Sequence, residues 1–102
     1  MQHESSDESA ESLKRQAELG RLLAAAEGYR VLASDGAAIG WLDHVRYERH
    51  ADHPDEIVVR RHALLPTRRH AFPFSAVAEV RPRQRAVVLH VERNTRGRPT
   101  AP

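Results

Sequence analysis

The chain has 102 residues, of which 40% are hydrophobic and 29% are charged, and its formal net charge is +2 at pH 7. A chain of this length forms one domain at most. Because it has no cysteine, disulfide frameworks and cysteine-based metal sites are excluded. Its first residues do not resemble a signal peptide, and its longest apolar run, residues 22–26, is too short to cross a bilayer. We therefore expect a cytoplasmic protein without membrane insertion.

The charge is distributed unevenly along the chain. Residues 1–27 have a net charge of −3, residues 28–80 are neutral, and residues 81–102 have +5. This distribution is typical of solvated ends on a folded centre. It predicts four segments: a disordered acidic tail at 1–8, an amphipathic helix at 9–27, a β domain at 28–92 and a disordered basic tail at 93–102.

The predicted helix begins near Ser9, where good helix formers follow acidic residues that favour the positive end of the helix dipole. Gly20 weakens it by about 1 kcal/mol relative to alanine, and Gly28 is placed to end it in a left-handed conformation. An apolar stripe recurs at helical spacing: Leu19, Leu22, Leu23 and Ala26. This stripe needs a partner. We expect it to pack on the β domain, and a homodimer formed through the same helix is the alternative.

After Gly28 the hydrophobic pattern becomes that of short β-strands. Asp35-Gly36 predicts a hairpin turn, because both residue types tolerate positive φ. The gaps between strands are too short for crossover helices, so parallel βαβ units are not expected. Six strands are predicted, at residues 29–33, 39–49, 56–61, 69–72, 74–80 and 86–91, the fifth beginning with one turn of 3₁₀ helix. Their near-regular spacing is typical of a small barrel or sandwich.

A set of residues spanning about 28–92 carries a family resemblance: Val31, Asp35-Gly36, Ile39-Gly40, Leu42, Val45, residues 57–59, Phe72-Pro73-Phe74, Val77, Val87, Leu89 and Val91. In this pattern the chain resembles the PRC-barrel family, which includes the photosynthetic reaction-centre H subunit and the C-terminal domain of the bacterial ribosome maturation factor. The resemblance implies a mainly β fold, a small antiparallel β-barrel of five to six strands. An amphipathic N-terminal helix is not a general part of that family.

The central motif has a physical interpretation. Gly40 lets its strand bend or approach a neighbouring backbone closely. Leu42 and Val45 are three residues apart, so both can face inward only if a β-bulge lies near Asp43–His44. Trp41 departs from the family, which usually has a polar or charged residue there. If its neighbours face inward, Trp41 faces outward. It is then covered by the N-terminal helix, as we expect, or it anchors an external partner.

The sequence contains no catalytic constellation and no cofactor motif. The Gly36 and Gly40 pair lacks the residues that accompany a phosphate-binding loop, so we interpret both as structural. His50 and His53, with carboxylates nearby, are weak metal-ligand candidates, but Pro54 disfavours the helix that would aim both rings at one ion. We expect a polar loop there. The other strand histidines are interpreted as surface residues: His44, His62, His70 and His90.

Because PRC barrels act as docking domains, the resemblance implies a non-enzymatic, PRC-barrel-type docking module that binds a protein partner. The candidate interface residues are Trp41, Leu19, Leu22, Leu23, Phe72 and Phe74. The alternative is an RNA- or ribosome-associated accessory factor that contacts phosphates through an arginine-rich region: Arg81, Arg83, Arg85, Arg93, Arg96 and Arg98. No aromatic stacking platform for bases lies near these arginines in the sequence, so a solvated tail is the favoured interpretation.

Overall fold

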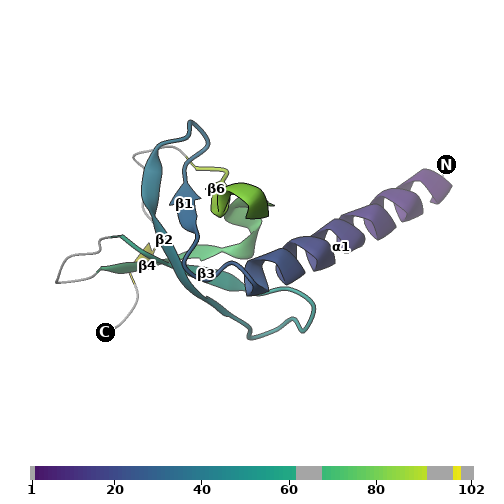
Figure 1. Ribbon diagram of the computed structural model, residues 1–102. Helices are drawn as coiled ribbons and strands as arrows, with labels where there is room; N and C mark the ends of the chain where they lie inside the picture. Colours follow the sequence, from purple (N-terminus) through teal and green to yellow (C-terminus); the bar gives the residue numbers. More distant parts are fainter. Residues whose placement is uncertain (1, 62–67, 92–97, 100–102) are drawn as a thin grey trace.

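A helix projects from a curled β-sheet in the computed structural model, which describes residues 2–61, 68–91 and 98–99 (Figure 1). The helix is α1 (Gln2–Ala24). The strands are β1 (Arg30–Leu32), β2 (Ala38–Arg46), β3 (Glu56–Arg60), β4 (Arg69–Pro73), β5 (Val77–Arg81), β6 (Ala86–Leu89) and β7 (Arg98–Pro99). Two 3₁₀ turns, η1 (Phe74–Ala76) and η2 (Pro82–Gln84), flank β5. The predicted mainly β fold with an N-terminal helix is confirmed, and η1 is the predicted 3₁₀ turn.

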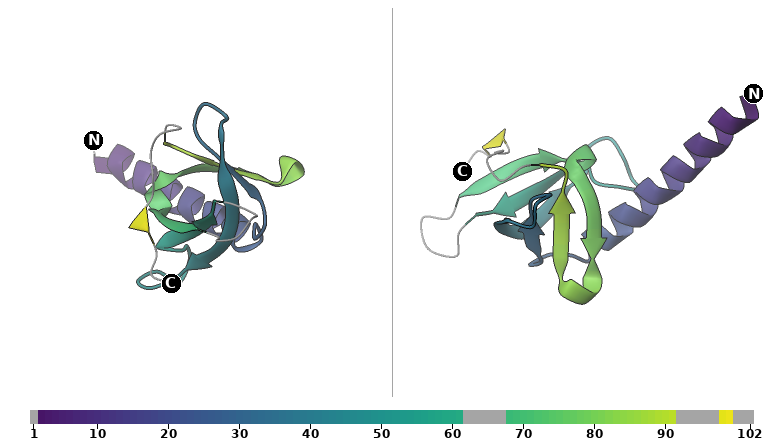
Figure 2. Two further views of the ribbon diagram at one scale, coloured as in Figure 1. Left: turned by 90° about the vertical axis from the view of Figure 1, so that its left-hand side faces the viewer. Right: turned by 90° about the horizontal axis from the view of Figure 1, so that it is seen from above.

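The strands form one sheet in the order β5-β6-β1-β2-β3-β4-β7. Neighbouring strands are antiparallel except β1 and β6, which run parallel. The prediction of a fully antiparallel sheet did not include this pair. It needs no crossover helix, because the other strands themselves connect β1 to β6. Within the described residues the edge strands β5 and β7 do not pair, so the sheet curls around its interior without closing into a hydrogen-bonded barrel (Figure 2).

The turn and the bulge predicted around β2 are both present. Gly36 has φ +88°, and Asp35 Oδ1 accepts a hydrogen bond from the Ala37 N–H at 3.0 Å. The pairing of β2 with β3 shifts register between Leu42 and His44, which makes Asp43 the additional residue of a bulge. Leu42 is therefore buried and Val45 packs against the same core, as the three-residue spacing requires.

Gly40 lies against the backbone of β3, as predicted. A Cβ added at this position would collide with the carbonyl oxygen of Arg60 and lie 3.0 Å from Cα of Arg61. No side chain fits at this point, so glycine here sets how closely β2 and β3 approach.

α1 begins at Gln2, earlier than predicted, so residues 2–8 are helical where the composition indicated a disordered tail. It ends at Ala24, before the predicted boundary, and Gly28 (φ +86°) lies in the turn that leads into β1. Its C-terminal part packs on the sheet: Leu23 is buried in the core, and Leu19 and Leu22 pack against it. The N-terminal part extends away from the sheet (Figures 1 and 2).

The core lies inside the curled sheet and is capped by the end of α1 and the turn that follows. Its members come from every strand from β1 to β6: Leu23, Ala26, Val31, Ala33, Ile39, Leu42, Ile57, Val59, Phe72, Phe74, Val77, Val80, Val87 and Leu89. Burial of these aliphatic and aromatic side chains is the main stabilising contribution to the fold.

Candidate docking surface

The outer face of β2, β3 and β4 combines aromatic, cationic and anionic side chains. Directly opposite residues on paired strands share a face. Trp41 on β2 lies opposite Arg60 on β3, which lies opposite Arg69 on β4. Near the other end of these strands Arg46 lies opposite Glu56. We call this surface the docking face and define it by Trp41, Asp43, His44, Arg46, Glu56, Arg60 and Arg69.

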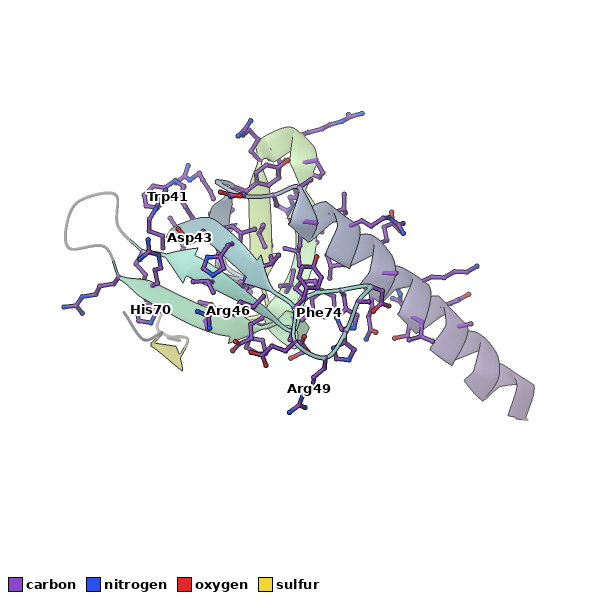
Figure 3. All side chains as sticks on the ribbon, turned by 90° about the horizontal axis from the view of Figure 1, so that it is seen from below. Trp41, Asp43, Arg46, Arg49, His70 and Phe74 are labelled. Atoms are coloured by element: carbon purple, nitrogen blue, oxygen red, sulfur yellow. The ribbon has the colours of Figure 1, made fainter. Side chains whose placement is uncertain are left out.

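Trp41 is half-buried, and the guanidinium carbon of Arg60 lies 5.9 Å from the centroid of its ring, a cation–π contact. The expectation that α1 covers Trp41 is wrong, because Trp41 lies well away from the helix (Figure 3). The helix packs instead at the end of the sheet near the β2–β3 loop, where it approaches His53. Trp41 therefore faces outward with Arg60 as its neighbour.

Arg60 differs from the other arginines of the docking face. Its Nε atom is buried and has no hydrogen-bond partner in the part of the chain that the structure describes. A buried donor without an acceptor carries an unrecovered desolvation penalty. An acceptor supplied from outside the chain would remove that penalty if the side chain turned toward it.

The carboxylates of the docking face are already paired. Asp43, presented by the bulge, accepts hydrogen bonds from His44 Nδ1 at 2.7 Å and from Arg69 Nε at 3.3 Å. Burial by itself would raise the pKa of Asp43, but the hydrogen bond from His44 and the charge of Arg69 outweigh this effect and lower the pKa. Arg46 Nη1 lies 3.8 Å from Glu56 Oε1. Two of the three guanidinium groups thus face a carboxylate, and the face is close to neutral.

The apolar centre of the docking face is covered by its own polar side chains. Val58 on β3 is fully buried, although it points to the opposite side from the core residues Ile57 and Val59. Arg69 on β4 reaches Asp43 on β2, so their ion pair spans the strand that carries Val58. This arrangement combines an apolar floor with charged side chains around it.

Most of the other predicted interface residues belong to the core. Leu23, Phe72 and Phe74 are at most 9% exposed, so they are not available to a partner in this fold. Leu19 and Leu22 are half-buried against the core. Sequence reasoning found Trp41 but not Arg60, Arg69 or Arg46. The alternation of Glu56, Val58 and Arg60 along β3 was the available signal, but placing them beside Trp41 required the strand register.

The predicted arginine cluster is divided by the fold. Arg81 pairs with Glu79, and the Arg85 guanidinium lies 5.4 Å from the centroid of the Tyr29 ring. Arg83 is exposed in η2. Arg98 lies in β7 beside Ala71 of β4, at the other end of the strand order. Arg93 and Arg96 lie outside the described residues.

The His50 and His53 pair is a stacked aromatic cluster in the loop between β2 and β3. The two ring centroids are 4.2 Å apart, and the His53 ring also stacks on Phe74 at 4.4 Å. His53 Nδ1 donates a hydrogen bond to the Pro54 carbonyl, and His50 Nδ1 donates one to Asp55. Parallel rings do not converge on one ion, and no group of three potential metal ligands gathers within the described segments.

In the part of the chain that the structure describes, the strand histidines do not gather at one place. His44 belongs to the docking face, His90 is exposed, and His70 is half-buried on β4. His62 lies outside the described residues. None of the helices described is both long and apolar enough to span a membrane.

Asp55 holds the β2–β3 loop, and we expect Asp55→Asn to lower the free energy of unfolding. Its carboxylate accepts hydrogen bonds from the backbone N–H groups of Arg49 (2.8 Å) and Glu48 (2.6 Å) and from His50 (2.8 Å), and these bonds hold its pKa well below the ordinary value of 3.8. This stabilisation is fully present above the ordinary pKa, and it is lost as the pH falls through the lowered pKa of the folded chain. Urea unfolding at about pH 7 and about pH 2.5 should show a difference between variant and wild type that narrows in acid. A constant difference would contradict this role.

Comparison with known proteins bears on the fold. A solved structure described as a putative 16S ribosomal RNA processing protein, RimM, from Pseudomonas aeruginosa superposes with a TM-score of 0.54 and 19% sequence identity. The match covers 74% of this chain and 44% of that one. The fold is PRC-barrel-like. This chain spans less than half the length of the RimM structure, and no protein-family model or curated protein matches it.

Proposed function

We propose that this chain is a non-enzymatic docking module that binds a protein partner through the docking face. The observation that carries the proposal is the contact between Trp41 and Arg60. Tryptophan and arginine are the residue types most enriched among interface hot spots, and here they are adjacent on a sheet face that the helix leaves uncovered.

The charge of the docking face favours a protein over a nucleic acid. Nucleic-acid surfaces need several unpaired cations, because phosphate neutralisation supplies much of the affinity. On this face Arg69 and Arg46 lie beside Asp43 and Glu56. A partner that offers one carboxylate to Arg60 and an apolar group to Trp41 fits such a surface better than a polyanion does.

A second candidate is an RNA- or ribosome-associated accessory role. Its support is the structural likeness to a protein described as a 16S ribosomal RNA processing factor, together with the exposed Arg83 in η2. In this case binding would use the turn between β5 and β6, separate from the docking face.

Affinity capture followed by calorimetry with the captured protein tests the first candidate. Trp41→Ala is expected to weaken binding by about 30-fold, or about 2 kcal/mol, as for an interface hot spot. Tyr47→Ala is the matched control, because Tyr47 is an exposed aromatic residue (48%) beyond the end of β2.

The same variants distinguish the second candidate. RNA binding through η2 should fall steeply with salt, weaken in Arg83→Glu and persist in Trp41→Ala. If Trp41→Ala binds the protein partner as tightly as wild type does, and RNA binding depends on salt and on Arg83, the docking proposal is wrong and the RNA-associated role replaces it.

A further inference from the structure

The N-terminal part of α1 is a helix without a covering surface in this chain. All described side chains from Ala10 to Arg15 are exposed, and Leu13 is 60% exposed. Contact with the rest of the protein begins near Gln16 and is closest at Gly20, against the β2–β3 loop. A helical segment this short is marginally stable in water without tertiary contacts. The projecting part of α1 therefore needs a second surface to pack against.

Apolar residues identify the side of the projecting helix that a partner surface would cover. Ala10, Leu13, Ala17 and Gly20 follow the alternating three- and four-residue spacing of a coiled-coil seam. The seam ends where Gly20 meets the β2–β3 loop. Ala10 and Leu13 lie on the N-terminal side of that contact, in the projecting part of the helix. The leucines that pack on the sheet, Leu19 and Leu23, belong to a different side of the helix.

The charges along α1 specify an antiparallel partner. Residues 2–12 contain four acidic residues and no basic one, whereas residues 13–24 contain Lys14, Arg15 and Arg21 and a single acidic residue, Glu18. Two copies side by side in parallel would place acid against acid and both sheets at the same end. Antiparallel copies place the acidic part of each helix beside the basic part of the other, with the two sheets at opposite ends.

We propose that the projecting part of α1 binds the same segment of a second copy of this chain as an antiparallel helix pair. In the register that the seam spacing favours, Ala10 of one copy meets Leu13 of the other. Position 7, an aspartate, then faces position 14, a lysine, on the flank of the seam, and the symmetry of the pair repeats this contact. This inference is independent of the docking face.

Light scattering with size-exclusion chromatography on the full chain, over a range of concentrations, tests the proposal. Wild type is expected to reach twice the monomer mass, and Leu13→Glu to remain monomeric while its β-sheet stays folded by circular dichroism, because Leu13 makes no core contact. A wild type that stays monomeric at every concentration, or a Leu13→Glu variant that still dimerises, overturns it.

A charge exchange tests the register. Asp7→Lys and Lys14→Asp should each raise the dimer dissociation constant roughly fivefold at low salt, and the double variant should restore it. Arg15→Asp is the matched control, since it makes the same change one residue away on another side of the helix. An equal effect of Arg15→Asp, or no recovery in the double variant, rules out this antiparallel register.

Discussion

Replacing Gly40 with alanine is expected to lower the free energy of unfolding by about 3 kcal/mol, the upper part of the usual range for overpacking. The new Cβ would collide with the carbonyl oxygen of Arg60 and lie 3.0 Å from Cα of Arg61. These are backbone atoms of the neighbouring strand, so no side chain can rotate to make room. Relief requires β2 and β3 to separate, which breaks their hydrogen bonds. Urea unfolding followed by circular dichroism measures the loss.

Gly36→Ala is the matched control for this prediction. Gly36 has φ +88°, and nothing lies within 4 Å of the point that an alanine Cβ would occupy, so alanine there has only backbone strain, about 1 kcal/mol. The difference between the two variants isolates the collision at Gly40. Because Trp41 and Arg60 form the adjacent pair, Gly40→Ala should also weaken binding at the docking face. Equal stabilities for the two variants would contradict the close approach of β2 to β3.

The features around Gly40 were predictable because they follow from local rules. Asp35-Gly36 can be recognised as a turn from its two residue types. The bulge at Asp43 follows from the spacing of Leu42 and Val45, since a strand cannot direct both inward without an additional residue. Each of these inferences uses residues that are neighbours in sequence, and each matches the structure.

The docking face could not be predicted in the same way, because it depends on contacts distant in sequence. Trp41 and Arg60 become neighbours only through the register of β2 with β3. The cover of Trp41 was assigned wrongly because the spacing of Leu19 and Leu23 defines an apolar helix side but not where on the sheet it packs. The pairing of β1 with β6 was missed for the same reason, since a parallel contact between strands that are distant in sequence leaves no local pattern.

Gly20 also illustrates the limit of local rules, and it gives the second large prediction. Helix propensity alone says that Gly20→Ala should stabilise α1 by about 1 kcal/mol. In the folded chain, however, the new Cβ would lie 2.6 Å from the carbonyl oxygen of Asp52 and 2.8 Å from Cα and Cβ of His53. His53 cannot retreat easily, because its ring is stacked between His50 and Phe74.

We therefore expect Gly20→Ala to lower the free energy of unfolding of the full chain by about 2 kcal/mol, while it raises the helicity of an isolated peptide of residues 2–24. Urea unfolding of the chain and circular dichroism of the peptide measure the two effects. The effects on the full chain and on the peptide have opposite signs if the contact between α1 and the β2–β3 loop decides the stability of the full chain. If the full chain were also stabilised, the β2–β3 loop would have to move away from the helix. The position of α1 on the sheet would then be set by Leu23 and Ala26 instead.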